Sequence, residues 1–93
     1  MAMAMVNVND LFVKATQDVK LLPGPLDNDT LLLLYSFYKQ ATIGNINTEK
    51  PAFFNFKEVA KWNAWAGLKD MQKIQAQGNY IKHVKDLQIK YQK

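Results

Sequence analysis

The chain has 93 residues, with 12 Lys, no Arg, 6 Asp and 2 Glu, which gives a formal charge of +4 at pH 7. It contains no Cys, one His and one Ser, which excludes a disulfide scaffold and a thiol nucleophile and argues against an internal Ser-His-Asp triad. The length predicts one domain with one modest core. The excess of lysine favours an anionic partner but does not identify it.

The N-terminus is apolar but does not resemble a secretory signal. It has no basic segment, and polar Asn7, Asn9 and Asp10 follow almost at once. The strongest apolar run, residues 31–38, is far shorter than the roughly 20 residues that a membrane-spanning helix needs. We therefore expect a soluble, cytoplasmic protein with a flexible segment over residues 1–9 and a single domain over residues 10–93.

Apolar side chains at helical spacing predict a first helix over residues 10–21. The stripe consists of Leu11, Ala15, Val19 and Leu22. Asn9 is the expected N-cap, because its side-chain oxygen can accept a free backbone N–H. Pro23 ends the helix, because a proline disfavours helical dihedrals at the residue before it.

A second helix is predicted over residues 28–43. Asp27 and Asp29 supply a cap and negative charge at the positive end of the helix dipole. Gly44 follows where a left-handed residue commonly closes a helix. Because residues 31–38 are apolar nearly all round, this helix needs apolar partners on more than one side.

A long connection over residues 45–55 leads to the second half of the chain. It contains Pro51, and loops of this length are often functional. A third helix is predicted over residues 56–69, where Asn55 and Glu58 have the spacing of a capping box.

A fourth helix is predicted over residues 71–90, with Asp70 as its cap. Its apolar stripe consists of Tyr80, Val84, Leu87 and Tyr91. Gly78 lies inside it, at a penalty of about 1 kcal/mol relative to Ala. No segment alternates with a period of two, so the chain is predicted to be an all-α four-helix bundle.

The most informative chemistry lies in the second helix. Tyr35 and Lys39 are four residues apart and share one face, which Tyr38 flanks. Lys57 and Lys61 repeat the spacing on the third helix, so three ammonium groups converge if the two helices face one another. A ring, a hydroxyl and ammonium groups together suit a phosphorylated aromatic ligand. Spacing alone more strongly favours the alternative of tyrosines at the core edge and solvated lysines.

Other candidate sites are weaker. Trp62 and Trp65, three residues apart, are expected to pack in the core. His83 has Asp86 three residues on, but two ligands do not make a metal site, so we expect no metal. No nucleophile can be paired with a base, so we expect no enzyme.

Two other classes of function stay open at this point. Twelve lysines and eleven aromatic residues are compatible with a basic nucleic-acid-binding bundle, although the lysines alternate with acidic residues and form no run. A protein-interaction module is the second alternative, since a small bundle can also serve as a segment that recruits a larger partner.

Several separate motifs resemble the acyl-CoA-binding protein family. Residues 35–44, YSFYKQATIG, are similar to the family's YxxYKQAT-G signature. Residues 47–51, NTEKP, match its loop, and residues 60–65, AKWNAW, match its AKWDAW block. The first and last helices also match, so the resemblance covers about residues 11–91.

The resemblance implies a four-helix up-down-down-up bundle with a long crossover between the second and third helices. It implies an intracellular carrier that binds medium- to long-chain fatty acyl-CoA thioesters without reacting with them, and that buffers and transports the acyl-CoA pool. The implied ligand is long-chain fatty acyl-CoA, with no cofactor. The implied partners exclude nucleic acid, and a monomer is expected. Transient contacts with membranes or with acyl-CoA-using enzymes stay open.

The resemblance also implies the ligand-binding residues. Tyr35, Lys39 and Lys61 would grip the 3′-phosphate of the CoA ribose, and Tyr38 would stack near the adenine. The full implied set is Lys20, Tyr35, Ser36, Phe37, Tyr38, Lys39, Lys57, Lys61 and Tyr80. The chain departs from the family pattern at Glu58 and Val59, where Gly and Lys are usual, which adds a negative charge beside the implied site.

Overall fold

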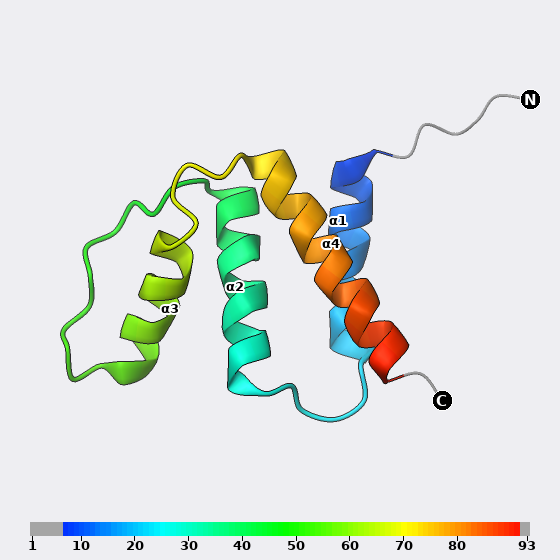
Figure 1. Cartoon of the computed structure of the whole chain (residues 1–93), viewed down its shortest axis with the longest axis horizontal. Coiled ribbons are helices and arrows are strands. Elements are labelled where there is room, and N and C mark those ends of the chain that lie inside the picture. Colours follow the sequence, from blue (N-terminus) through cyan, green and yellow to red (C-terminus); the bar gives the residue numbers. More distant parts are fainter. Residues whose placement is uncertain (1–6, 92–93) are drawn as a thin grey trace, which may run out of the picture.

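The computed structural model of the chain describes residues 7–91, and these residues form helices without strands. The helices run antiparallel and parallel in the order up, down, down, up (Figure 1), as predicted. Their bounds are α1 Val8–Asp18, the short 3-10 helix η1 Val19–Leu21, α2 Asn28–Thr42, α3 Phe56–Ala66 and α4 Lys73–Lys90. None of the described helices is long and apolar enough to cross a membrane.

The core is built by three of the helices. α4 packs against both α1 and α2, and the buried cluster between them takes two side chains from α1 and three each from α2 and α4. These are Phe12, Ala15, Leu34, Phe37, Ala41, Ala76, Tyr80 and Val84. The small residue Ala76 is fully buried, which fits a close approach of α4 to its neighbours.

α3 stands outside this core. It packs against α2, and its one buried side chain is Trp65. Figure 1 shows α3 at the edge of the molecule, with α2 between it and α1 and α4. α2 therefore has neighbours on two sides, as its nearly all-round apolar sequence predicted.

The long crossover between α2 and α3 is fastened by the two indoles of α3. The Trp65 indole N–H donates to the Gly44 carbonyl at 2.7 Å, and the Trp62 indole N–H donates to the Thr48 carbonyl at 2.9 Å. Trp65 is buried, in agreement with its predicted core role, whereas Trp62 is only half-buried. The prediction that Trp62 lies in the core is wrong in that respect, because its ring contacts the crossover, where Lys50 Nζ lies 5.8 Å from the ring centroid.

A buried polar group joins the end of α2 to the later part of the α3–α4 connection. Gln40 is 1% exposed, and its side-chain N–H groups donate to Asn45 Oδ1 at 3.0 Å and to the Met71 carbonyl at 2.8 Å. Asn45 in turn accepts the backbone N–H of Asp70 at 2.7 Å. These bonds satisfy polar groups where the helices end, so the crossover starts from a fixed point.

At the helix starts, three of the predicted caps differ from those in the structure. α1 begins at Val8 because Asn7, not Asn9, is the N-cap, and the backbone N–H of Asn9 donates to its side chain at 2.7 Å. The predicted flexible segment therefore has residues 8 and 9 in a helix, and its first six residues lie outside the described residues. Asn55 occupies the N-cap position of α3 but makes no capping hydrogen bond with its side chain.

Asp70 does not cap α4, which starts three residues later with Gln72 at its N-cap. Asp70 instead adopts a left-handed conformation, with φ 75°, and its carboxylate accepts from Asn45 Nδ2 at 3.2 Å. The predicted left-handed residue after α2 is confirmed, since Gly44 has φ 98°. α3 ends at Ala66 rather than at residue 69, because a turn over residues 67–70 replaces its last turn.

Candidate functional site

A groove of about 750 Å³ runs between α2 and α3. It exists because α3 contributes little to the core, so the apolar face of α2 on that side is only partly covered. Leu31 remains 49% exposed and Phe56 78% exposed. The groove is lined by Asn28, Leu31, Leu32 and Tyr35 from α2, and by Phe56, Lys57, Glu58, Ala60 and Lys61 from α3.

Positive charge gathers around the ring of Tyr35 at the wall of this groove. Lys61 Nζ lies 5.0 Å from the Tyr35 ring centroid, and Lys39 Nζ lies 5.8 Å from it. Lys39 Nζ also lies 5.2 Å from the Trp65 ring. Cation–π attraction at these distances restrains two flexible lysine side chains. The structure thus brings Tyr35, Lys39 and Lys61 together from two helices.

One carboxylate competes for this positive charge. Glu58 lines the groove and its Oε2 lies 3.5 Å from Lys61 Nζ. Both side chains are substantially exposed, at 51% and 39%, so the ion pair is weak. An anion of higher charge that enters the groove can therefore replace Glu58 as the partner of Lys61 with only a small loss of free energy.

Tyr38 and Tyr80 form a second aromatic group on the α1 and α4 side of α2. Phe12 packs against both, with its ring centroid 5.9 Å from that of Tyr38 and 5.1 Å from that of Tyr80. Tyr38 is 43% exposed, whereas Tyr80 is 5% exposed. Burial, and next the neighbouring Tyr38, raise the pKa of the Tyr80 phenol above its ordinary value. Tyr38 therefore presents a ring to solvent that is backed by two others.

Besides Lys39, Tyr38 and Tyr80, three further residues implied by the family pattern lie outside the groove lining. Ser36 is buried and its hydroxyl donates to the Leu33 carbonyl at 2.7 Å within α2. Phe37 is buried in the core and stacks on His83 with centroids 5.4 Å apart. Lys20 is exposed on η1, at the end of α1.

Sequence reasoning did not single out Trp65 or Leu31 as members of the site. Trp65 lies four residues after Lys61, and Leu31 lies four residues before Tyr35. Helical spacing therefore places Trp65 on the same face as Lys61, and Leu31 on the same face as Tyr35. Spacing alone could not assign these residues to the site, because the assignment depends on which face of α3 turns toward α2.

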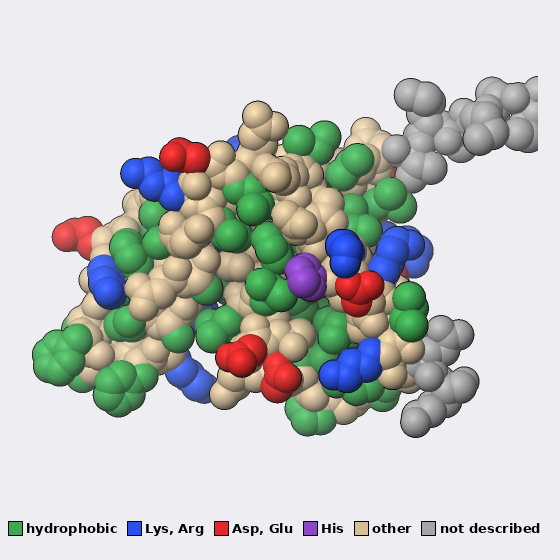
Figure 2. Space-filling model, viewed as in Figure 1, with side chains coloured by type: hydrophobic (Ala, Val, Ile, Leu, Met, Phe, Trp, Pro, Cys, Tyr) green, Lys and Arg blue, Asp and Glu red, His purple; other side chains and the backbone are tan. Residues whose placement is uncertain are grey.

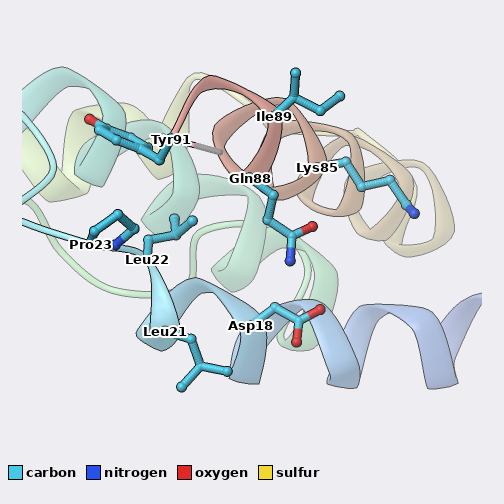
Figure 3. A pocket seen from close by; sticks show the side chains of 8 residues that line it. All are labelled: Asp18, Leu21, Leu22, Pro23, Lys85, Gln88, Ile89 and Tyr91. Carbon is cyan, nitrogen blue, oxygen red and sulfur yellow. The ribbon is translucent and has the colours of Figure 1, made fainter. Parts of the chain in front are cut away.

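A second hollow, of about 550 Å³, lies between the end of α1 and the end of α4. Its charged lining residues are Asp18 and Lys85, one of each sign. In Figure 3, the Leu21 and Ile89 side chains point away from each other rather than toward a shared space. This hollow offers no convergent charge, so the groove between α2 and α3 is the stronger candidate for an anionic amphiphile. Residues 7–91 contain no cluster of three or more potential metal ligands.

The fold and the groove define an all-α binding bundle, and comparisons with known proteins identify its family. The family model for the acyl-CoA-binding protein matches residues 9–84. An acyl-CoA-binding protein of Gossypium hirsutum is 42% identical over 82 residues, which are 88% of this chain and 92% of the relative. Acyl-CoA-binding protein 2 of Saccharomyces pastorianus is 43% identical over 84 residues, or 90% and 97% of the two chains.

A solved structure agrees with these relatives. The crystal structure of acyl-CoA-binding protein 2 from Oryza sativa superposes with a TM-score of 0.85 at 37% identity, over 90% of this chain and 93% of that one. The chain belongs to the acyl-CoA-binding protein family. The family resemblance and the up-down-down-up bundle expected from the sequence are both confirmed.

Proposed function

We propose that the protein is a carrier of fatty acyl-CoA thioesters, with the nucleotide held at Tyr35 and the acyl chain along the groove between α2 and α3. One observation carries this assignment: two ammonium groups lie 5.0 and 5.8 Å from a single tyrosine ring at the wall of an apolar groove. Family membership supports it, since relatives at 42% and 43% identity are named for acyl-CoA binding.

The charge of the ligand fits the cluster. CoA carries about four negative charges near neutral pH, of which about two lie on its 3′-phosphate. Lysine binds a compact phosphate as a point charge, and a phenol hydroxyl donates to a phosphate oxygen. In this proposal Tyr35, Lys39 and Lys61 bind the 3′-phosphate, and Lys57, which also lines the groove, stabilises the neighbouring phosphates.

The remaining implied residues have supporting parts. Tyr38 offers an exposed ring for stacking on the adenine, and Tyr80 holds Tyr38 from behind, with ring centroids 6.3 Å apart. Lys20 contacts the phosphates from η1. Ser36 and Phe37 are proposed to act by fixing α2 rather than by reaching the nucleotide, because both side chains are buried.

The acyl chain supplies most of the affinity in this account. Burying a methylene group contributes about 0.8 kcal/mol, so a chain of 14 to 18 carbons offers on the order of 10 kcal/mol before ordering costs. The phosphate cluster then selects CoA esters over free fatty acids. We expect the carrier to act as a monomer in the cytoplasm and to leave the thioester intact.

Calorimetric titration with palmitoyl-CoA, CoA and palmitate tests the proposal. Palmitoyl-CoA should bind at least about a hundredfold more tightly than either fragment, because it alone uses both the charged cluster and the apolar groove. Sedimentation and incubation with the thioester check the monomer and the absence of hydrolysis. Equal affinities for palmitate and palmitoyl-CoA would refute the assignment.

A further inference from the structure

Three phenylalanines stand exposed at the end of the crossover and the start of α3. Phe53 is 83% exposed, Phe54 67% and Phe56 78%. Figure 2 shows hydrophobic side chains projecting over this corner of the molecule, next to the start of α3 in Figure 1. We call Phe53, Phe54 and Phe56 the aromatic tip. Large exposed apolar side chains that gather in this way mark an interaction site.

The backbone holds two of these rings outward. The Asn55 N–H donates to the Ala52 carbonyl at 2.9 Å, which closes a four-residue turn with Phe53 and Phe54 at its two central positions. Such positions usually carry Gly, Pro, Asn, Asp or Ser. The two rings pack edge to face on one another, with centroids 5.6 Å apart, and neither belongs to the core cluster. Folding of the bundle therefore does not account for them.

The charged residues around the aromatic tip indicate which kind of partner it binds. Lys50 and Lys57 flank it and are exposed. The acidic neighbours of the tip in the sequence are Glu49 and Glu58, and Glu58 forms a weak ion pair with Lys61 at 3.5 Å. Exposed rings with lysines at their margin match a bilayer that contains anionic lipid, where rings enter the interface and ammonium groups meet the headgroups.

The tip is also continuous with the groove. Phe56 belongs to both, since it lines the groove between α2 and α3. A bilayer that takes up the tip therefore faces the mouth of a groove suited to an amphiphile. A ligand of that kind would pass between the two surfaces without crossing water.

We propose that the aromatic tip docks the protein on anionic membrane surfaces by inserting Phe53 and Phe54 into the interface. This goes beyond the carrier function and does not depend on it, since docking requires no bound ligand. It gives the chain a defined orientation, with the groove mouth toward the lipid.

The test measures binding of the ligand-free chain to phosphatidylcholine vesicles with and without phosphatidylserine. F53A/F54A should weaken binding to the anionic vesicles at least about tenfold, because two rings no longer enter the interface. The matched control is L21A/I89A, which removes two side chains that are 82% and 69% exposed far from the tip, and it should change binding less than about twofold. Both pairs are surface changes, and circular dichroism verifies the fold.

Two lysine variants separate insertion of the rings from general electrostatic attraction to the vesicles. Lys50→Gln should weaken binding about fivefold on vesicles with phosphatidylserine and leave binding to phosphatidylcholine unchanged. Lys85→Gln removes the same charge from an exposed position of α4, so it should weaken binding to the phosphatidylserine vesicles less than Lys50→Gln does and also leave binding to phosphatidylcholine unchanged.

A wild-type chain that does not bind the vesicles would overturn the proposal, and so would three further results. The first is equal weakening by the tip and control pairs. The second is unchanged vesicle binding by F53A/F54A with a loss of palmitoyl-CoA affinity in solution, which would assign the rings to the acyl chain. The third is a dimer in sedimentation that F53A/F54A dissociates. Failure of the carrier function would show in the wild-type titrations and leave the vesicle result standing.

Discussion

The ring of Tyr35 is where charge and apolar surface meet in this molecule. It lines the groove, and it has Lys39 and Lys61 within 6 Å of its centroid at 5.8 and 5.0 Å. Two like charges near one ring repel each other, and the ring's negative face offsets part of that repulsion. In the proposed function, a bound phosphate would offset the rest.

Glu58 weakens this arrangement, and its removal provides a prediction. Glu58→Gln should raise the affinity for palmitoyl-CoA about twofold to fivefold, because an exposed carboxylate no longer competes for Lys61 or repels the phosphates. The gain should shrink at high salt. Titration calorimetry at two salt concentrations measures both effects.

Glu49→Gln is the control for that experiment. It removes the same charge from an exposed residue that does not line the groove, and it should change the affinity less. A Glu58→Gln variant that binds no better than Glu49→Gln would mean that Lys61 does not meet the ligand's phosphate.

Helical spacing predicted that Tyr35 and Lys39 share one face of α2, and the structure places the Lys39 ammonium group beside the Tyr35 ring. Spacing could not show that Ser36 and Phe37 turn inward, since a helix that is apolar nearly all round gives no preferred face. It also could not show that Lys61 reaches Tyr35, because that contact depends on the packing of α3 against α2.

At the scale of the helices, α2 begins with a charged cap. The Thr30 N–H donates to the Asp27 carboxylate at 2.8 Å, and hydrogen bonding to Thr30 lowers the pKa of Asp27 from 3.8. A lowered pKa means that the ionised cap stabilises the fold above pH 3.8 and that this contribution is lost as the pH falls through the lower, folded-state value.

Asp27→Ala should therefore lower the melting temperature at pH 7, and the difference from the wild type should shrink as the pH falls below 3.8. Asp27→Asn keeps a capping oxygen without a titratable proton, so it should recover most of the melting temperature and flatten its dependence on pH. Thermal melts between acid and neutral pH test this. A difference between Asp27→Ala and the wild type that does not change with pH would contradict the role of the charge.

The attachment of α3 rests on one buried side chain, Trp65, which is 3% exposed. Trp65→Ala should lower the free energy of unfolding by about 3–5 kcal/mol, because it leaves a cavity and removes the hydrogen bond to Gly44. Trp62→Ala should lower it by only about 1–2 kcal/mol, since that ring is half-buried. Urea unfolding compares the two. Equal losses would mean that Trp62 also anchors the bundle.

The predicted helices are correct in number and order within residues 7–91, and their ends are less accurate. Gly44 was predictable because a left-handed residue after a helix strongly favours glycine. The role of Asp70 was not, because it depends on a partner distant in sequence. Asp70 is held by Asn45, which is 25 residues away.

At the scale of the whole molecule, α2 separates the core from the groove. Its one side completes the core with α1 and α4, and its other side forms the groove with α3. On the face of the molecule that Figure 2 shows, the lysines are scattered among acidic side chains. The formal charge of +4 is therefore not gathered into one patch on this face. A groove separate from the core can accept a ligand without unpacking the bundle.

The most direct test of the account compares palmitoyl-CoA with its 3′-dephospho form, by calorimetry, on the wild type and on Lys39→Ala. The wild type should bind the dephospho ligand about tenfold to a hundredfold more weakly, because the charged hydrogen bonds to the phosphate are lost. In Lys39→Ala the same change should have a clearly smaller effect, because one of those bonds is already missing. Equal binding of the two ligands by the wild type, or an undiminished loss in the variant, would contradict the phosphate site at Tyr35, Lys39 and Lys61.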